Sequence, residues 1–138
     1  MDNKYWLEYV KHCYDLVIES EGNTKLILDH EIEAYVVHLM ARNFNRIDIG
    51  ETPIAIQLLT SIQKKLPKEK ILHTADECIL IHSFPLKKSK WPNQNYFRDM
   101  GTIAYGLADH AMEKHFDNAS QVMSGIFNRN FDRLLKFH

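Results

Sequence analysis

The side chains of this sequence that could do chemistry gather in one short stretch, HTADECILIHSFP, from His73 to Pro85. It combines histidines, acidic residues and a cysteine, and imidazole is both the commonest metal ligand and the side chain that titrates near neutral pH. The apolar residues of the stretch recur at helical spacing, which predicts a helix. The stretch is therefore either a metal-binding segment or one packed helix of an ordinary core.

Projection on a helical wheel separates the two histidines of this stretch. His82 falls on the apolar face with Cys78, whereas His73 and Glu77 fall on the far side, and Asp76 lies between. One helix therefore cannot bring both histidines to the same ion. We interpret His82 as a core histidine bonded to a carbonyl or a tyrosine, because a buried imidazole without a partner costs about 1–3 kcal/mol. His73 and Glu77 are expected to form an exposed pair one turn apart.

The other histidines do not complete a recognisable metal site. A carboxylate-bridged two-metal bundle uses Glu-x-x-His motifs, whereas this chain has only the reversed order, at His30–Glu33 and His110–Glu113. The zinc motif His-Glu-x-x-His is missing, and the two cysteines lack the spacing of a structural zinc site. No glycine-rich nucleotide-binding loop and no Gly-x-Ser-x-Gly motif occurs either. The sequence therefore predicts no metal, no cofactor and no catalytic residue.

Helical periodicity extends over nearly the whole chain and predicts an all-α fold, a single domain of about six helices spanning residues 1–138. The expected helices cover residues 5–19, from 29 onward, 53–66, 69–84, 93–114, and from 117 or 118 almost to the C-terminus. The segment SEGNT is expected to end the first helix, Asp29 to cap the second and Pro67 to stop the third.

The composition is that of an ordinary globular protein and argues against several classes. The chain has 138 residues, of which 45% are hydrophobic and 25% charged, with a formal net charge of -1. This balance argues against a nucleic-acid partner, and no apolar run approaches the ~20 residues of a membrane span. Cysteines without a Cys-x-x-Cys pair, and an N-terminus without a signal-peptide pattern, favour a cytoplasmic protein with no membrane partner.

Small residues line one side of the expected fifth helix. Gly101, Ala104, Ala108 and Ala111 fall along this side at helical spacing. Small residues let a partner helix approach closely. We favour packing within the chain, with a homodimer seam as the alternative, since symmetric dimers are the commonest oligomers.

The loop PLKKSKWPN carries the candidates for binding a partner: Lys87, Lys88, Lys90 and Trp91. A basic loop with an aromatic tip between two prolines could touch an acidic partner or a phosphate backbone. The alternative is a solvated loop, with Trp91 folded back on the core.

The segments ADECILIHSFP and YFRDMGTIAYGLA together resemble a pattern in a family of small all-helical proteobacterial proteins. The matching positions are Asp76, Phe84-Pro85, Tyr96, Gly101 and Ala104-Tyr105. Ala75 departs from the pattern, which has glycine there. The resemblance implies a helical fold and a bacterial source, and it implies no activity.

If the positions of this pattern act as a set, they place polar residues between the fourth and fifth helices. The ligand-binding candidates there are Asp76, His82, Tyr96 and Tyr105. A structural network of hydrogen bonds is the interpretation we prefer. The leading functional hypothesis is a non-catalytic interaction or regulatory domain that self-associates as a homodimer. The alternative is a metal- or small-ligand-binding helical protein that uses these four residues.

Overall fold

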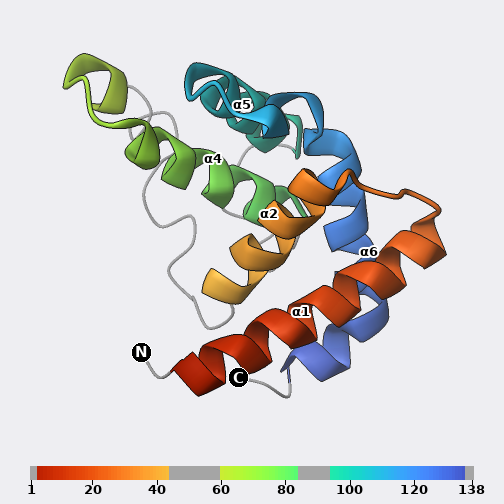
Figure 1. The fold of residues 1–138 in the computed structure, drawn as a ribbon. Coiled ribbons are helices and arrows are strands. Elements are labelled where there is room, and N and C mark those ends of the chain that lie inside the picture. The colour runs from red at the N-terminus through yellow and green to blue at the C-terminus, as the bar shows by residue number, and fades with distance from the viewer. Residues whose placement is uncertain (1–2, 44–59, 84–93, 136–138) are drawn as a thin grey trace. The chain divides into compact units, whose positions relative to one another are not determined.

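The computed structural model describes residues 3–43, 60–83 and 94–135. The elements in chain order are α1 (Asn3–Thr24), α2 (His30–Arg42), α4 (Lys68–Ser83), α5 (Gln94–Leu107), the 3-10 helix η1 (Ala111–Lys114) and α6 (Phe116–Leu135) (Figure 1). Residues 60–63 are also helical, and no strand occurs in the part of the chain described. The predicted all-α fold class is confirmed.

Residue contacts divide the chain into two compact units. Unit 1 consists of Met1–Ile47 and Gln121–His138, and unit 2 of Asp48–Ser120. Unit 1 thus contains α1, α2 and most of α6, whereas unit 2 contains α4, α5, η1 and the first residues of α6. That the chain forms one domain stays a prediction.

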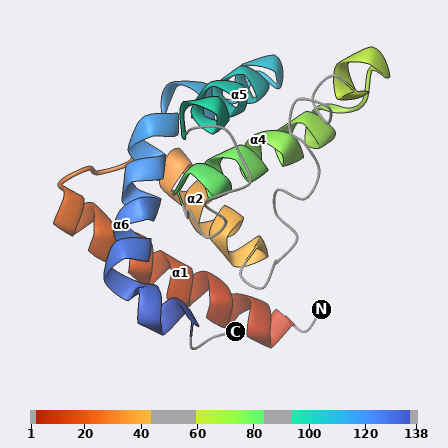
Figure 2. The same cartoon turned by 180° about the vertical axis from the view of Figure 1, so that it is seen from behind.

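In unit 1, α1 lies against α6, as both Figure 1 and Figure 2 show. The hydroxyl of Ser20 donates a hydrogen bond to the carbonyl oxygen of Val122 at 2.6 Å. A Cβ added at Gly125 would lie 2.5 Å from Ser20 Oγ and 3.0 Å from Thr24 Cγ2. Only glycine therefore permits this close approach of the two helices.

The end of α1 differs from the prediction. The segment SEGNT was expected to break the helix after Glu19, but α1 continues through Thr24. The hydroxyls that favour a break are bonded in ways compatible with a helix, because Thr24 Oγ1 donates to the carbonyl of Ser20 one turn earlier at 2.8 Å. The helix ends only at Lys25, whose φ of 59° is left-handed.

A buried carboxyl group holds the connection between α1 and α2. Glu21 is 2% exposed, and its Oε2 accepts a hydrogen bond from the backbone N–H of Leu28 at 2.7 Å. Its side chain also hydrogen-bonds that of Glu33 on α2. Burial raises the pKa of Glu21, and the Glu33 bond and charge act in the same direction, while the Leu28 bond and the charge of His30 oppose them.

In unit 2, α4 and α5 pack closely because α5 carries a glycine at the contact. A Cβ at Gly101 would lie 2.6 Å from the ring of Phe116 and 2.9 Å from the Cβ of Cys78. Ala104 and Ala108 are also buried. The preferred interpretation, close packing within the chain, is confirmed for Gly101. Gly101, Ala104 and Ala108 are thus covered within the chain and cannot form the alternative homodimer seam, whereas Ala111, the fourth residue of the predicted side, is exposed and lies in η1.

The end of α5 and the start of α6 also differ from the prediction. Helix α5 ends at Leu107 instead of continuing to residue 114, because Asp109 adopts a left-handed φ of 54°. The N–H of His110 then donates to the carbonyl of Tyr105 at 2.9 Å, which closes the helix end. Helix α6 begins at Phe116, so neither Asp117 nor Asn118 precedes it as a cap.

Most of the predicted helix 53–66 lies outside the described residues. Its last part is helical at 60–63 and turns at Lys65, whose φ is 51°. The N–H of Leu66 donates to the carbonyl of Ser61 at 2.9 Å, the same closure that ends α5. The helical residues therefore end at 63, three residues earlier than predicted, and the turn at Lys65 closes them before Pro67.

Candidate functional site

Two of the predicted candidates meet between α4 and α5. The phenol of Tyr105 donates a hydrogen bond to Oδ1 of Asp76 at 2.7 Å. Tyr105 is fully buried, at 0% exposure, so its hydroxyl needs a partner inside the protein. The bond joins a carboxylate of α4 to a residue of α5, which is the structural network that we preferred for this pair.

A second polar group joins α4 to the first turns of α6. Nδ1 of His82 lies 2.7 Å from Oγ of Ser120, and Oγ of Ser120 lies 2.8 Å from Oγ of Ser83. His82 is half-buried and does have a hydrogen-bond partner, as expected. The partner is a serine, however, and not the expected carbonyl or tyrosine.

Burial disfavours the charged form of the His82 imidazole, and two neighbouring charges act on it in opposite directions. Burial lowers the pKa of His82, the charge of Arg98 acts in the same direction, and the charge of Asp117 opposes both. Arg98 holds Asp117 in a two-pronged ion pair, with Nε–Oδ1 and Nη2–Oδ2 distances of 2.8 Å. That hydrogen-bonded pair lowers the pKa of Asp117.

An aromatic ring stands next to both polar groups. Phe116 has its ring centroid 5.6 Å from that of His82 and 6.4 Å from that of Tyr105, edge-on in both cases. The glycine at position 101 makes room for this ring. One phenylalanine thus packs against a member of each polar pair of unit 2.

Tyr96, the remaining candidate, belongs to an apolar cluster. The structure packs it, half-buried, with Ile81 and Met100 against Cys78 and Phe97. Its ring lies edge-on to that of Phe97, with centroids 5.2 Å apart. The packing of Tyr96 is therefore mainly apolar.

His82 and Ser120 are as close as a catalytic base and its nucleophile, but the hydroxyls of Ser120 and Ser83 are too deeply buried for a substrate to reach them. Ser120 is 2% exposed and Ser83 is 1% exposed. A nucleophilic hydroxyl has to reach its substrate, whereas these hydroxyls are enclosed by the protein. The arrangement is suited to fixing the start of α6 against the end of α4.

The pair of His73 and Glu77 is present, with Nε2 and Oε1 2.8 Å apart, but it is not an exposed pair. The His73 side chain is 53% exposed and that of Glu77 only 6%. The prediction assumed one buried face, whereas α4 also buries Thr74 and Leu80 on either side of Glu77. His73 therefore partners a buried carboxylate.

Within the described residues, no three histidine, cysteine, aspartate or glutamate side chains are grouped so that they could hold a metal ion. His110, from one of the reversed motifs, accepts a hydrogen bond on Nδ1 from the N–H of Met112 and so caps η1. Cys13 and Cys78 are free and buried. Burial raises the pKa of each thiol to about 12, which keeps both protonated.

The other predicted site lies outside the described residues. Lys87, Lys88, Lys90 and Trp91 all fall within residues 84–93. Their role in binding a partner stays a prediction.

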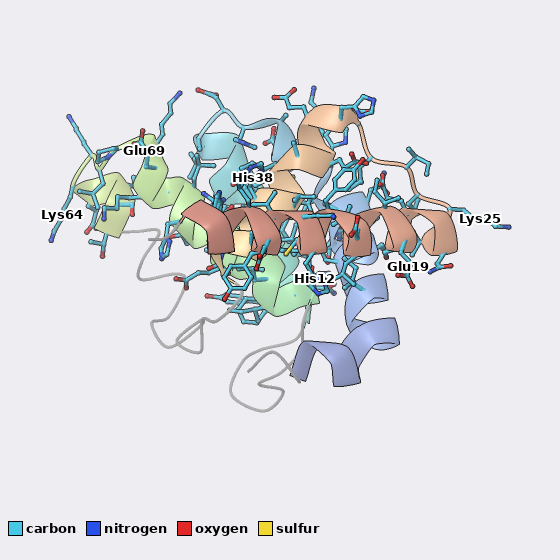
Figure 3. The ribbon with its side chains drawn as sticks, turned by 60° about the horizontal axis from the view of Figure 1, so that its bottom comes forward. His12, Glu19, Lys25, His38, Lys64 and Glu69 are labelled. Atoms are coloured by element: carbon cyan, nitrogen blue, oxygen red, sulfur yellow. The ribbon has the colours of Figure 1, made fainter. Side chains whose placement is uncertain are left out.

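The outer face of α1 carries a feature that the sequence analysis did not identify. Leu7, Tyr14 and Ile18 are 67%, 47% and 41% exposed, and all three lie on one side of the helix, with the exposed Lys11 between Leu7 and Tyr14. Figure 3 shows α1 in front, with the labelled Glu19 below its ribbon. We call these four residues the α1 stripe. Their spacing, that of a coiled-coil seam, was the sequence signal that could have revealed them.

Comparison of the chain with protein-family models, with curated proteins and with solved structures found no match. No helix of the described residues is both long enough and apolar enough to cross a bilayer.

Proposed function

We propose that this chain is a non-catalytic helical interaction domain that self-associates as a dimer. The observation that carries the proposal is the α1 stripe, in which large apolar side chains at helical spacing face water. A row of exposed apolar residues on a helix marks a surface at which another helix can bind. Covering these side chains removes their apolar surface from water, which favours association.

The hydrogen bonds of unit 2 favour a structural role for the polar candidates over a ligand site. Asp76 and Tyr105 bond one another, and His82 bonds Ser120. A ligand that used these atoms would have to replace bonds that already join α4 to α5 and α6. The polar residues are therefore better suited to holding unit 2 together than to binding a metal or a small molecule.

A cytoplasmic location is part of the proposal. The support is the state of the two cysteines, which are free and buried. Their pKa values of about 12 keep both thiols in the protonated, unreactive form. Thiols that remain unpaired are typical of a reducing compartment.

Sedimentation velocity of the full chain over a range of concentrations tests the proposal. We expect a monomer–dimer equilibrium that Ile18→Glu abolishes, because a carboxylate on the α1 stripe would have to be desolvated in the dimer. Ile103→Glu is the matched control, since Ile103 is a 51% exposed isoleucine on α5. Circular dichroism shows that both variants stay folded. A wild-type chain that remains monomeric at hundreds of micromolar contradicts the proposal.

A further inference from the structure

The α1 stripe reads the same in either chain direction. Leu7, Lys11, Tyr14 and Ile18 are separated by four, three and four residues, so the spacing is the same when it is read from either end. Reversal of the helix therefore exchanges Leu7 with Ile18 and Lys11 with Tyr14. In coiled-coil terms these residues take alternating d and a positions, which face the partner helix.

We infer that the partner of the α1 stripe is the same stripe on a second copy of this chain, running antiparallel, with Lys11 of each copy against the partner's Tyr14 and the partner's Asp15. The inference rests on the proposed function and names its partner and register. A two-fold axis then passes between the two helices near their middle. Such an interface is self-complementary, as a symmetric dimer requires.

The apolar residues fit this antiparallel register. Each end of the paired stripes brings Leu7 of one copy to Ile18 of the partner subunit, so the most exposed leucine of α1 is covered by an aliphatic residue. The two central layers each bring a lysine to a tyrosine, whose ring face attracts a cation. Every side chain of the α1 stripe thus has a complementary neighbour.

The charges beside the α1 stripe select the antiparallel direction. Lys11 is its only basic residue, and the exposed Glu8 and Asp15 line one flank. A parallel pair would place Lys11 directly opposite the partner's Lys11, because parallel helices pair like positions. The antiparallel pair instead brings Lys11 beside the partner's Asp15, where its positive charge also offsets the approach of Glu8 to that same carboxylate, and the two-fold axis makes this arrangement twice.

The size of the α1 stripe indicates a reversible dimer. A stable interface buries about 800 Å² on each partner, whereas the α1 stripe offers three large apolar side chains. We therefore expect copies that exchange between monomer and dimer, and an affinity that depends visibly on each charged contact.

Charge-reversal variants test the antiparallel register, with the dimer affinity measured by sedimentation velocity. Lys11→Glu and Asp15→Lys should each weaken the wild-type dimer by about tenfold or more, because each places like charges opposite one another twice. The double variant Lys11→Glu/Asp15→Lys restores opposite charges and should recover the wild-type affinity. Glu31→Lys, a charge reversal at an exposed residue of α2, is the control and should dimerise like the wild type.

Disulfide trapping gives a second, independent measurement. Chains with Leu7→Cys mixed with chains with Ile18→Cys should form the mixed disulfide, while neither chain alone should cross-link efficiently. Cross-linking of the Leu7→Cys chain with itself would show a parallel pair and overturn the inference. The native thiols are buried, which keeps them out of the reaction.

The two proposals fail in different ways. A dimer that depends on Ile18 but is not recovered by the double charge variant overturns the antiparallel register and leaves the proposed function standing. A wild-type chain that stays monomeric overturns both.

Discussion

Unit 1 and unit 2 each enclose a titratable side chain that joins two helices. Burial shifts the pKa values of these two side chains in opposite directions, so a fall in pH affects their contributions to stability in opposite ways. In unit 1 the side chain is Glu21, whose pKa is raised by burial. In unit 2 it is His82, whose pKa is lowered by burial. Burial disfavours the charged form in both cases. The charged form is the deprotonated one for a carboxyl group and the protonated one for an imidazole.

The pH windows follow from these directions. The folded state holds the proton of Glu21 more tightly than the unfolded state, so the stability that this group contributes is lost as pH rises above its ordinary value of 4.5. The folded state holds a proton on His82 less tightly, so its contribution is lost as pH falls below 6.5. A rise in pH thus removes the contribution of Glu21 in unit 1, and a fall in pH removes that of His82 in unit 2.

The largest expected effect concerns packing instead of charge, at the close contact of Gly101 in unit 2. Gly101→Ala in unit 2 should lower the free energy of unfolding by about 2 kcal/mol, because its Cβ meets a ring and another Cβ. Gly22→Ala on α1 is the control, since nothing lies within 4 Å of its added Cβ. It should stabilise the chain by about 0.5–1 kcal/mol. Urea unfolding of both variants measures the difference, and equal effects would contradict the contact at Gly101.

Removal of one buried hydroxyl tests whether the polar residues of unit 2 are structural. Ser120→Ala deletes the atom that both His82 and Ser83 bond, and should cost about 1–2 kcal/mol of stability. Thr102→Ala is the comparison, because that hydroxyl only bonds the carbonyl of Arg98 on its own helix. Thermal unfolding that shows no larger loss for Ser120→Ala would argue against the structural role.

Replacing the carboxyl group of Glu21 should remove the contribution of this group to the pH dependence of stability. Glu21→Gln keeps an oxygen that accepts from Leu28 and cannot ionise beside Glu33. We expect a gain on the order of 1 kcal/mol at neutral pH that shrinks toward pH 4.5. The measurement is the difference in melting temperature between variant and wild type over this pH range. A difference that stays constant with pH would show that Glu21 does not titrate as inferred.

The smallest effect is expected at His82. His82→Asn keeps a polar atom near Ser120 but does not titrate, so the stability of this variant should fall less than that of the wild type as pH drops below 6.5. The half-buried ring is partly screened by water, so the difference should stay below about 1 kcal/mol. The same melting-temperature series measures it, and a steeper fall in the variant would reverse the assigned sign.

Local chemistry made some of the fold predictable from the sequence. Helix α2 begins directly after Asp29, which occupies its N-cap position although its side chain makes no capping hydrogen bond, and α4 begins directly after Pro67. These residues act on their own neighbours, so their effect is visible in a short window. The end of α1 was not predictable in this way. Ser20 bonds Val122, which is 102 positions away in the sequence.

The candidate site was predictable only in part, for the same reason. The contact of Asp76 with Tyr105 was anticipated because both positions belong to one pattern of residues. Ser120, the partner of His82, gives no periodic signal of its own. Glu77 is buried because helices pack on more than one side of α4, which a single wheel cannot show.

Helix α6 carries Phe116–Ser120 in unit 2 and continues from Gln121 in unit 1. A ribosome makes the chain from its N-terminus, so all the residues of unit 2 have been made before Val122, to which Ser20 bonds. Domains tend to fold as their residues emerge during synthesis. Helices α1 and α2 are therefore made first, and their unit is completed last. Until then the side of α1 that bonds α6 through Ser20 lacks this partner.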